Sequence, residues 1–166
     1  MRSVKQWAAD QSSREKRRDA RARGLKFEDE IADYLRSIGF AVDVAAPVKT
    51  MMRIRGQMVW RNLKVDFFGC LDVMGIHPDR DYFLPIQATT ARGQLAQKRR
   101  DMDKVKWNLS SSRPQIWIRG HGPKPLEGKG IPVSIFNLCI VGKDDIPDWQ
   151  EQRYFLNHGV WIEALE

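Results

Sequence analysis

Apolar side chains recur at helical spacing between residues 24 and 39. At about 100° per residue they form one stripe, and charged side chains lie on the other side. Gly39 follows the last apolar position and is typical of a helix C-terminal cap. The pattern therefore predicts an amphipathic helix whose buried stripe comprises Phe27, Ile31, Tyr34, Leu35 and Ile38.

Downstream of this helix, alternating and continuous apolar runs predict mainly strands. Residues 47–64 mix methionines and arginines around Gly56, and they fit a loop or a hairpin around Met58–Trp60 equally well. The order of elements predicts an α/β fold, more closely an α+β sandwich with one mixed central sheet flanked by helices. We expect strands at 40–45, 71–76, 82–90, 115–119, 132–141 and 160–162, and helices at 91–109 and 148–156.

Basic side chains are concentrated in two blocks. The chain of 166 residues has 28 Lys and Arg against 21 Asp and Glu, a net charge of +7. Residues 1–23 contain eight basic and three acidic side chains, and residues 92–106 contain six and two. Clusters of this kind indicate a polyanion-binding surface, although a solvated arm and a charged helix face would show the same pattern. The expected phosphate-binding residues are Arg14, Arg17, Arg18, Arg21, Arg23, Arg92, Arg99, Arg100 and Lys104.

The length and composition favour one domain with its own core, preceded by a basic segment. We expect residues 1–23 to form a basic N-terminal arm or helix, separated by Gly24 from a single domain at 24–166. No apolar run reaches the roughly 18–20 residues that span a bilayer, so we expect no membrane partner. Cys70 and Cys139 show no CxxC spacing, and the three histidines are scattered. A reduced, cytoplasmic protein without zinc is the expectation.

One set of polar residues at the predicted strands suits a hard divalent cation. Asp72 opens the strand at 71–76, and Gln87 and Thr89 share one face of the next strand. A short turn between the strands can bring these side chains together. Carboxylate and amide oxygens are ligands that Mg²⁺, or Mn²⁺, accepts while keeping several waters. Asp72 and Gln87 are therefore candidate metal ligands.

Glu28 is the helix acid best placed to join them. On the helical wheel it borders the apolar stripe, so its carboxylate can reach over the edge of the sheet. Alternatively, Glu28 completes an N-terminal turn, where the helix dipole favours an acid.

These residues resemble a known family. The segment Gly24–Glu28, the later Gly39-Phe40, Asp72 at a strand start and Gln87 near the end of the next strand are similar to archaeal-type and phage Holliday junction resolvases. These enzymes belong to the PD-(D/E)xK nuclease superfamily, and the resemblance covers residues 24–109. It implies a restriction-endonuclease-like fold, one or two Mg²⁺ ions, DNA as partner and a homodimer. The acids of the family hold ions that activate water, and its lysine stabilises the charge on phosphorus.

The sequence departs from the family motif at two positions. Gln87 stands where the family has Glu or Asp, and Thr89 stands where it has lysine. The superfamily moves this lysine to the following helix in some members, and Lys98 lies on the apolar stripe of the helix at 91–109. Lys98 reaches the site, extends to solvent or contacts a phosphate of the second DNA strand. Asp66 is a further candidate, as a metal or water ligand or as an Asx-turn residue.

The expected function is metal-dependent endonuclease activity on branched or structured DNA, resembling Holliday junction resolution in recombination. Glu28, Asp72, Gln87 and Lys98 are the expected catalytic set, with Asp66 as a fourth metal ligand and Thr89 as a secondary member. The compartment would be the nucleoid, or the host cytoplasm for a phage protein. A nuclease-fold protein that binds nucleic acid without cutting it is the alternative, because Glu and Lys are both replaced. A basic interaction protein recruited through residues 1–23 is a third possibility.

Overall fold

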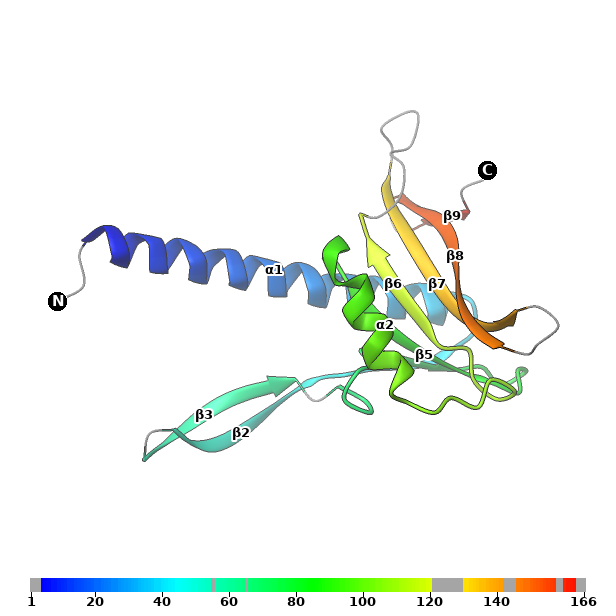
Figure 1. Cartoon of the computed structure of the whole chain (residues 1–166), viewed down its shortest axis with the longest axis horizontal. Helices are drawn as coiled ribbons and strands as arrows, with labels where there is room; N and C mark the ends of the chain where they lie inside the picture. Colours follow the sequence, from blue (N-terminus) through cyan, green and yellow to red (C-terminus); the bar gives the residue numbers. More distant parts are fainter. Residues whose placement is uncertain are drawn as a thin grey trace.

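A helix of 34 residues, α1 (Val4–Ser37), dominates the N-terminal part of the molecule. In the computed structural model its C-terminal third packs on the sheet, and the remainder extends well beyond it (Figure 1). The structure describes residues 4–54, 56–64, 66–120, 130–141, 146–157 and 160–163. The helix runs without a break through Gly24, so Gly24 does not separate two helices. Glycine in a helix costs about 1 kcal/mol relative to alanine, which the flanking helix formers offset.

A mixed sheet of seven strands forms the body, in the order β1-β4-β5-β6-β7-β8-β9. Only β5 and β6 pair in parallel among the described strands, because α2 crosses between them. The α+β fold expected from the sequence is confirmed. The strands and short helices are β1 (Ala41–Val44), β4 (Val73–Ile76), β5 (Phe83–Thr89), η1 (Arg92–Gln94), α2 (Leu95–Asp103), β6 (Gln115–Arg119), β7 (Ile131–Val141), β8 (Ile146–Asn157) and β9 (Val160–Glu163).

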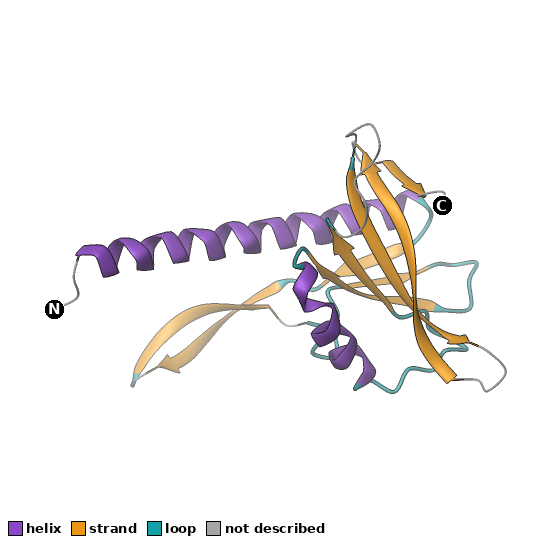
Figure 2. Cartoon of the chain, turned by 45° about the horizontal axis from the view of Figure 1, so that its top comes forward, coloured by secondary structure: helices purple, strands orange, loops and turns teal. Residues whose placement is uncertain are grey.

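Residues 47–64 form a separate two-stranded antiparallel sheet, the hairpin of β2 (Pro47–Ile54) and β3 (Gln57–Lys64). The hairpin and the N-terminal part of α1 extend from the same side of the body, as two views of the molecule agree (Figures 1 and 2). Of the two possibilities for this segment, the hairpin is therefore the one observed.

Two expected helices differ from the structure. The helix predicted at 91–109 is a 3-10 turn followed by α2, which ends at Asp103. The helix predicted at 148–156 is part of the long strand β8, which pairs with β7 from Val141↔Ile146 to Ile131↔Leu156. This continuous ladder overrides the local helical preference of the segment.

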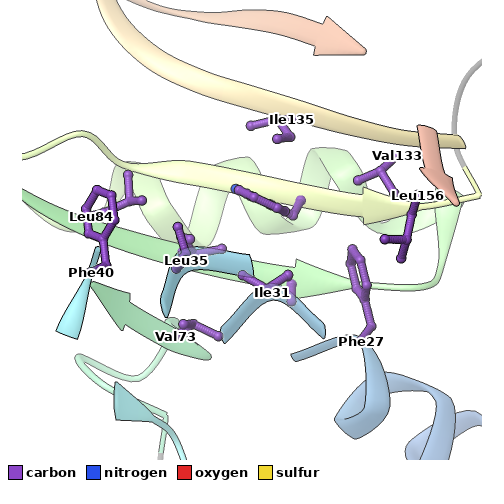
Figure 3. Packing of buried hydrophobic residues seen from close by; sticks show 12 residues of the cluster. Phe27, Ile31, Leu35, Phe40, Val73, Leu84, Val133, Ile135 and Leu156 are labelled. Atoms are coloured by element: carbon purple, nitrogen blue, oxygen red, sulfur yellow. The ribbon is translucent and has the colours of Figure 1, made fainter. Parts of the chain in front are cut away.

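The core lies on both faces of the sheet. On one face Phe27, Ile31 and Leu35 of the α1 stripe are fully buried against Val73 and Ile86, as the sequence predicts (Figure 3). Of the other two predicted members, Tyr34 is partly buried and Ile38 is 42% exposed. Met102 of α2 packs on the other face, together with a second buried cluster: Cys70, Leu71, Ile116, Ile118 and Phe136. The chain therefore carries one helix on each face of the sheet, with α1 opposite α2.

Candidate metal and nuclease site

Asp72 and Gln87 lie against each other, as their predicted strands require. Val73 pairs with Ile86, which places the two polar residues in adjacent positions at the end of the β4–β5 ladder. Gln87 Nε2 donates to Asp72 Oδ2 at 3.5 Å, and the amide of Ala88 donates to the same oxygen at 2.8 Å. Both side chains are buried.

The carboxylate of Asp72 lies at the end of the sheet rather than behind one face. The amide of Asp72 donates to the carbonyl of Ile86, so Ile86 directs its backbone polar groups toward β4. Ala88, two residues later, directs its amide the same way. The side chain of Asp72 thus takes the place of a ladder partner for Ala88, where β4 begins.

Gln87 contributes an amide oxygen to this site. It alternates with Ile86 and Ala88, which face α1, so its side chain lies on the α2 face. Its Oε1 atom is buried and has no hydrogen-bond partner among the described residues. A buried polar acceptor of this kind is unusual and calls for a ligand such as a water or a cation.

Glu28 lies at the same end of the sheet as Asp72. The guanidinium of Arg119, at the C-terminal end of β6, stands 5.8 Å from the centre of the Phe27 ring. Arg119 also pairs with Glu30 at 2.8 Å, which turns that flank of α1 toward β6. Glu28 occupies the opposite flank of the stripe, toward β4, and is buried. It therefore approaches the start of β4 from the α1 face.

Cys70, two residues before Asp72, has a buried thiol whose pKa is raised. Burial raises its pKa, the carboxylates of Asp101, Asp66 and Asp72 raise it further, and the ammonium of Lys98 lowers it. Lys98 is half-buried on α2. The thiol itself lies 3.9 Å from the sulfur of Met102.

Thr89 does not supply a cation, and its hydroxyl is engaged locally. Its Oγ1 accepts the amide of Ala91 at 3.1 Å and lies 3.4 Å from Gln94 Oε1. The hydroxyl is thus used to shape the turn from β5 into η1. Asp66 lies in the turn before β4, and its carbonyl accepts the amide of Gly69.

The donor set fits a hard divalent ion only if Gln87 takes part. No group of three or more His, Cys, Asp or Glu side chains with metal-binding geometry occurs in the described part of the chain. Two buried carboxylates, Glu28 and Asp72, together with the unpartnered amide oxygen of Gln87, are the ligand types that Mg²⁺ accepts. Asp66, the fourth ligand that the sequence suggests, acts with its carboxylate on the same Cys70 thiol as Asp72.

The expected phosphate-binding residues are divided between the two helices. Arg14, Arg17, Arg18, Arg21 and Arg23 are exposed along the extended part of α1, and Arg100 and Lys104 are exposed on and just after α2. Arg99 differs, because its guanidinium stacks 4.9 Å from the ring centre of Phe136 and is half-buried. The side chain of Arg92, like residues 1–3, His121 and His158, lies outside what the structure describes.

The charge counts that single out residues 1–23 and 92–106 overlook a third basic block. Residues 47–64 contain five basic side chains (Lys49, Arg53, Arg55, Arg61 and Lys64) and no acidic one. Acidic residues elsewhere mask this excess in the net charge. Trp60, which core packing would bury, is 59% exposed in the hairpin.

A cavity elsewhere in the molecule is separate from this site. It has a volume of about 350 Å³ and lies near the C-terminal end of α1, with Tyr34, Trp117 and Trp161 in its lining. Glu28, Asp72 and Gln87 do not line it.

Comparison with known proteins gives no match: no family model, no curated protein and no solved structure resembles this chain significantly. Among the described helices, none combines the length and apolar character needed to cross a membrane.

Proposed function

We propose that the protein is a metal-dependent endonuclease that acts on branched or structured DNA. The observation that carries the proposal is the contact of Asp72 with Gln87 at the end of the β4–β5 ladder, beside the unpartnered Gln87 Oε1. Glu28 from α1 supports it, since it lies at the same end of the sheet.

In this proposal Asp72, Gln87 and Glu28 hold one Mg²⁺ or Mn²⁺ ion. The bound ion supplies Lewis-acid activation of the attacking water and offsets negative charge on the phosphodiester. Gln87 brings no charge, so the site binds a cation more weakly than one with three carboxylates. The amide of Ala88 fixes one oxygen of Asp72, which leaves the orientation of the carboxylate defined.

We assign to Lys98 the role of the cation that stabilises charge on phosphorus, because the neutral hydroxyl of Thr89 cannot fill it. Its ammonium and the carboxylates of Asp72 and Asp66 act on the same thiol, that of Cys70. A lysine held on α2 offsets charge that develops on the phosphate during cleavage, because it is in place before the reaction begins. The arginines of α1 and the exposed cations of α2 hold the DNA backbone, which makes binding salt-dependent and largely independent of sequence.

A cleavage assay tests the proposal. Purified protein is incubated with a four-way DNA junction and a linear duplex in Mg²⁺, Mn²⁺ or EDTA, and nicking is followed on denaturing gels. We expect nicks in either ion, none in EDTA, and loss of activity in Asp72→Asn and Glu28→Gln. Unchanged activity in both variants would exclude this site.

The second candidate is a nuclease-fold protein that binds branched nucleic acid without cutting it. Thr89 favours it, because its hydroxyl serves the β5–η1 turn and no ammonium stands at that position. Tight binding of the junction without cleavage in either ion would select this function. A homodimer, with two sites for the two strands to be cut, accompanies the first proposal and is tested by sedimentation.

A further inference from the structure

The hairpin of β2 and β3 exposes both of its faces. It forms a sheet of its own and extends away from the body (Figure 2). An isolated two-stranded hairpin is only marginally stable in water, and large exposed apolar side chains add to the cost. An arm of this form is typical of a binding element whose exposed apolar side chains become buried against a partner.

The two faces of the hairpin differ in chemistry. Met51 pairs with Trp60 and Arg53 pairs with Met58, and Lys49 lies on the same face two residues before Met51. This first face, which we call the Trp60 face, carries three cations at its paired positions (Lys49, Arg53 and Lys64, the partner of Pro47) beside three large exposed side chains. The opposite face presents Val48, Thr50, Met52, Gln57 and Val59, and among the paired positions its one cation is Arg61, the partner of Thr50.

Charge decides which partner fits the Trp60 face. With five basic and no acidic side chains in residues 47–64, two copies of the hairpin would repel each other. A polyanion gains from every one of those cations. The ammonium of Lys49 stands 5.5 Å from the centre of the Trp60 ring, so the cation and the aromatic surface are presented together.

We propose that the Trp60 face is a DNA-binding surface that recognises branch points, with Trp60 stacking on a base exposed at the branch. A two-stranded ribbon fits a DNA groove, and aromatic side chains at such ribbons stack on or wedge between bases. Bases inside a duplex are already stacked on both sides, whereas a branch exposes a base face. Lys49 and Arg53 contact the neighbouring phosphates. This inference rests on the proposed nuclease function and gives that function its preference for branched DNA.

The base of the hairpin meets the candidate site. The amide of Ala45, two residues before β2, donates to the carbonyl of Asp72 at 2.8 Å. Met51, the partner of Trp60, follows Ala45 by six residues, and a fully extended chain of that length spans at most about 20 Å. With DNA at about 3.4 Å per nucleotide, cleavage should fall within about six nucleotides of the branch.

Binding measured without cleavage tests the inference separately from the nuclease proposal. Fluorescence anisotropy in EDTA compares a labelled four-way junction with a duplex of the same sequence. We expect Trp60→Ala to weaken junction binding about tenfold or more and duplex binding less than threefold. Trp60→Phe should stay within about threefold of wild type on both DNAs because it keeps an aromatic face. Met52→Ala, on the opposite face of the hairpin, is the matched control and should leave both affinities unchanged.

A junction carrying 2-aminopurine at the branch gives a second readout. Stacking on Trp60 should quench its fluorescence, and Trp60→Ala should abolish the quenching. Equal losses on both DNAs, no loss, or a change of oligomeric state in Trp60→Ala by sedimentation would overturn the inference. If the protein cuts junctions but Trp60→Ala leaves junction binding unchanged, only the role of the hairpin is refuted. If the protein prefers the junction to the duplex through Trp60 but never cleaves DNA, only the nuclease proposal is refuted.

Discussion

Asp72 accepts the backbone amide of Ala88 with its carboxylate, at 2.8 Å. A side chain thereby ends the β4–β5 ladder where a backbone carbonyl would otherwise continue it. The same oxygen receives Gln87 Nε2 at 3.5 Å. Asp72 thus has a structural role in the sheet and also belongs to the candidate site. Substitutions of Asp72 distinguish these two roles.

Removing the acceptor should destabilise the fold more than removing only the charge. Asp72→Ala leaves the Ala88 amide buried without its partner, which costs about 1–3 kcal/mol. Asp72→Asn keeps an oxygen within reach of the Ala88 amide. Its free energy of unfolding should therefore decrease by less than half as much as that of Asp72→Ala. Urea denaturation checks both, and a loss of equal size in the two variants would contradict the contact.

A carboxylate at position 87 should strengthen metal binding and weaken the apo protein. Gln87→Glu adds a second buried negative charge beside Asp72, so the metal-free protein should unfold at lower temperature. The added charge should raise Mg²⁺ affinity about tenfold or more, and Mg²⁺ should then restore the melting temperature. Gln150→Glu, at an exposed position on β8, is the control and should show no Mg²⁺-dependent shift. If Mg²⁺ stabilises both variants alike, Gln87 is not a ligand.

Lys98 should affect cleavage more than DNA binding. Lys98→Ala should slow cleavage about 100-fold, because a positioned cation near the phosphate is lost. DNA affinity should change less than threefold, and Lys98→Arg should recover part of the rate. Arg100→Ala, on the exposed side of the same helix, should show the reverse: weaker binding and a smaller salt dependence, with the rate at saturating DNA retained. Similar behaviour of Lys98→Ala and Arg100→Ala would place Lys98 among the phosphate contacts.

The stability of the protein should fall on the alkaline side through Cys70. Burial, with Asp101, Asp66 and Asp72 adding to it, raises the pKa of this thiol. The folded protein therefore keeps the proton while the unfolded chain releases it above pH about 8.5, so the free energy of unfolding decreases there. Cys70→Ser should flatten this decrease between pH 8 and 10, and Cys139→Ser should not. Equal slopes for the two variants would show that Cys70 does not titrate differently in the fold.

The sequence predicted the parts of the fold that have a strong periodic signal. Phe27, Ile31 and Leu35 repeat at helical spacing over one long stripe, and they are fully buried as expected. Residues 148–156 lack such a stripe. Their helix-forming residues pointed to a helix, but long-range pairing of β8 with β7 decides the structure, and no local pattern reports that pairing.

The sequence predicted which residues of the candidate site lie in strands, but it did not predict how they are arranged in space. Alternation placed Gln87 and Thr89 on one face, which is correct, yet Thr89 is engaged by Ala91 and Gln94 in the turn that follows. The pattern could not show that Asp72 would lie at the end of the sheet rather than on a face. The exposure of Trp60 was missed because apolar spacing in residues 47–64 cannot distinguish a buried strand from a projecting hairpin. The absence of acidic residues over that segment was the available signal.

The position of a bound ion tests the central claim most directly. Crystals of the protein soaked in Mn²⁺ give an anomalous difference map in which the ion is located independently of any activity. We expect one strong peak with the oxygens of Asp72, Gln87 and Glu28 around it at about 2.0–2.6 Å. An ion bound elsewhere, or no peak at saturating Mn²⁺, would contradict a metal site at this end of the sheet.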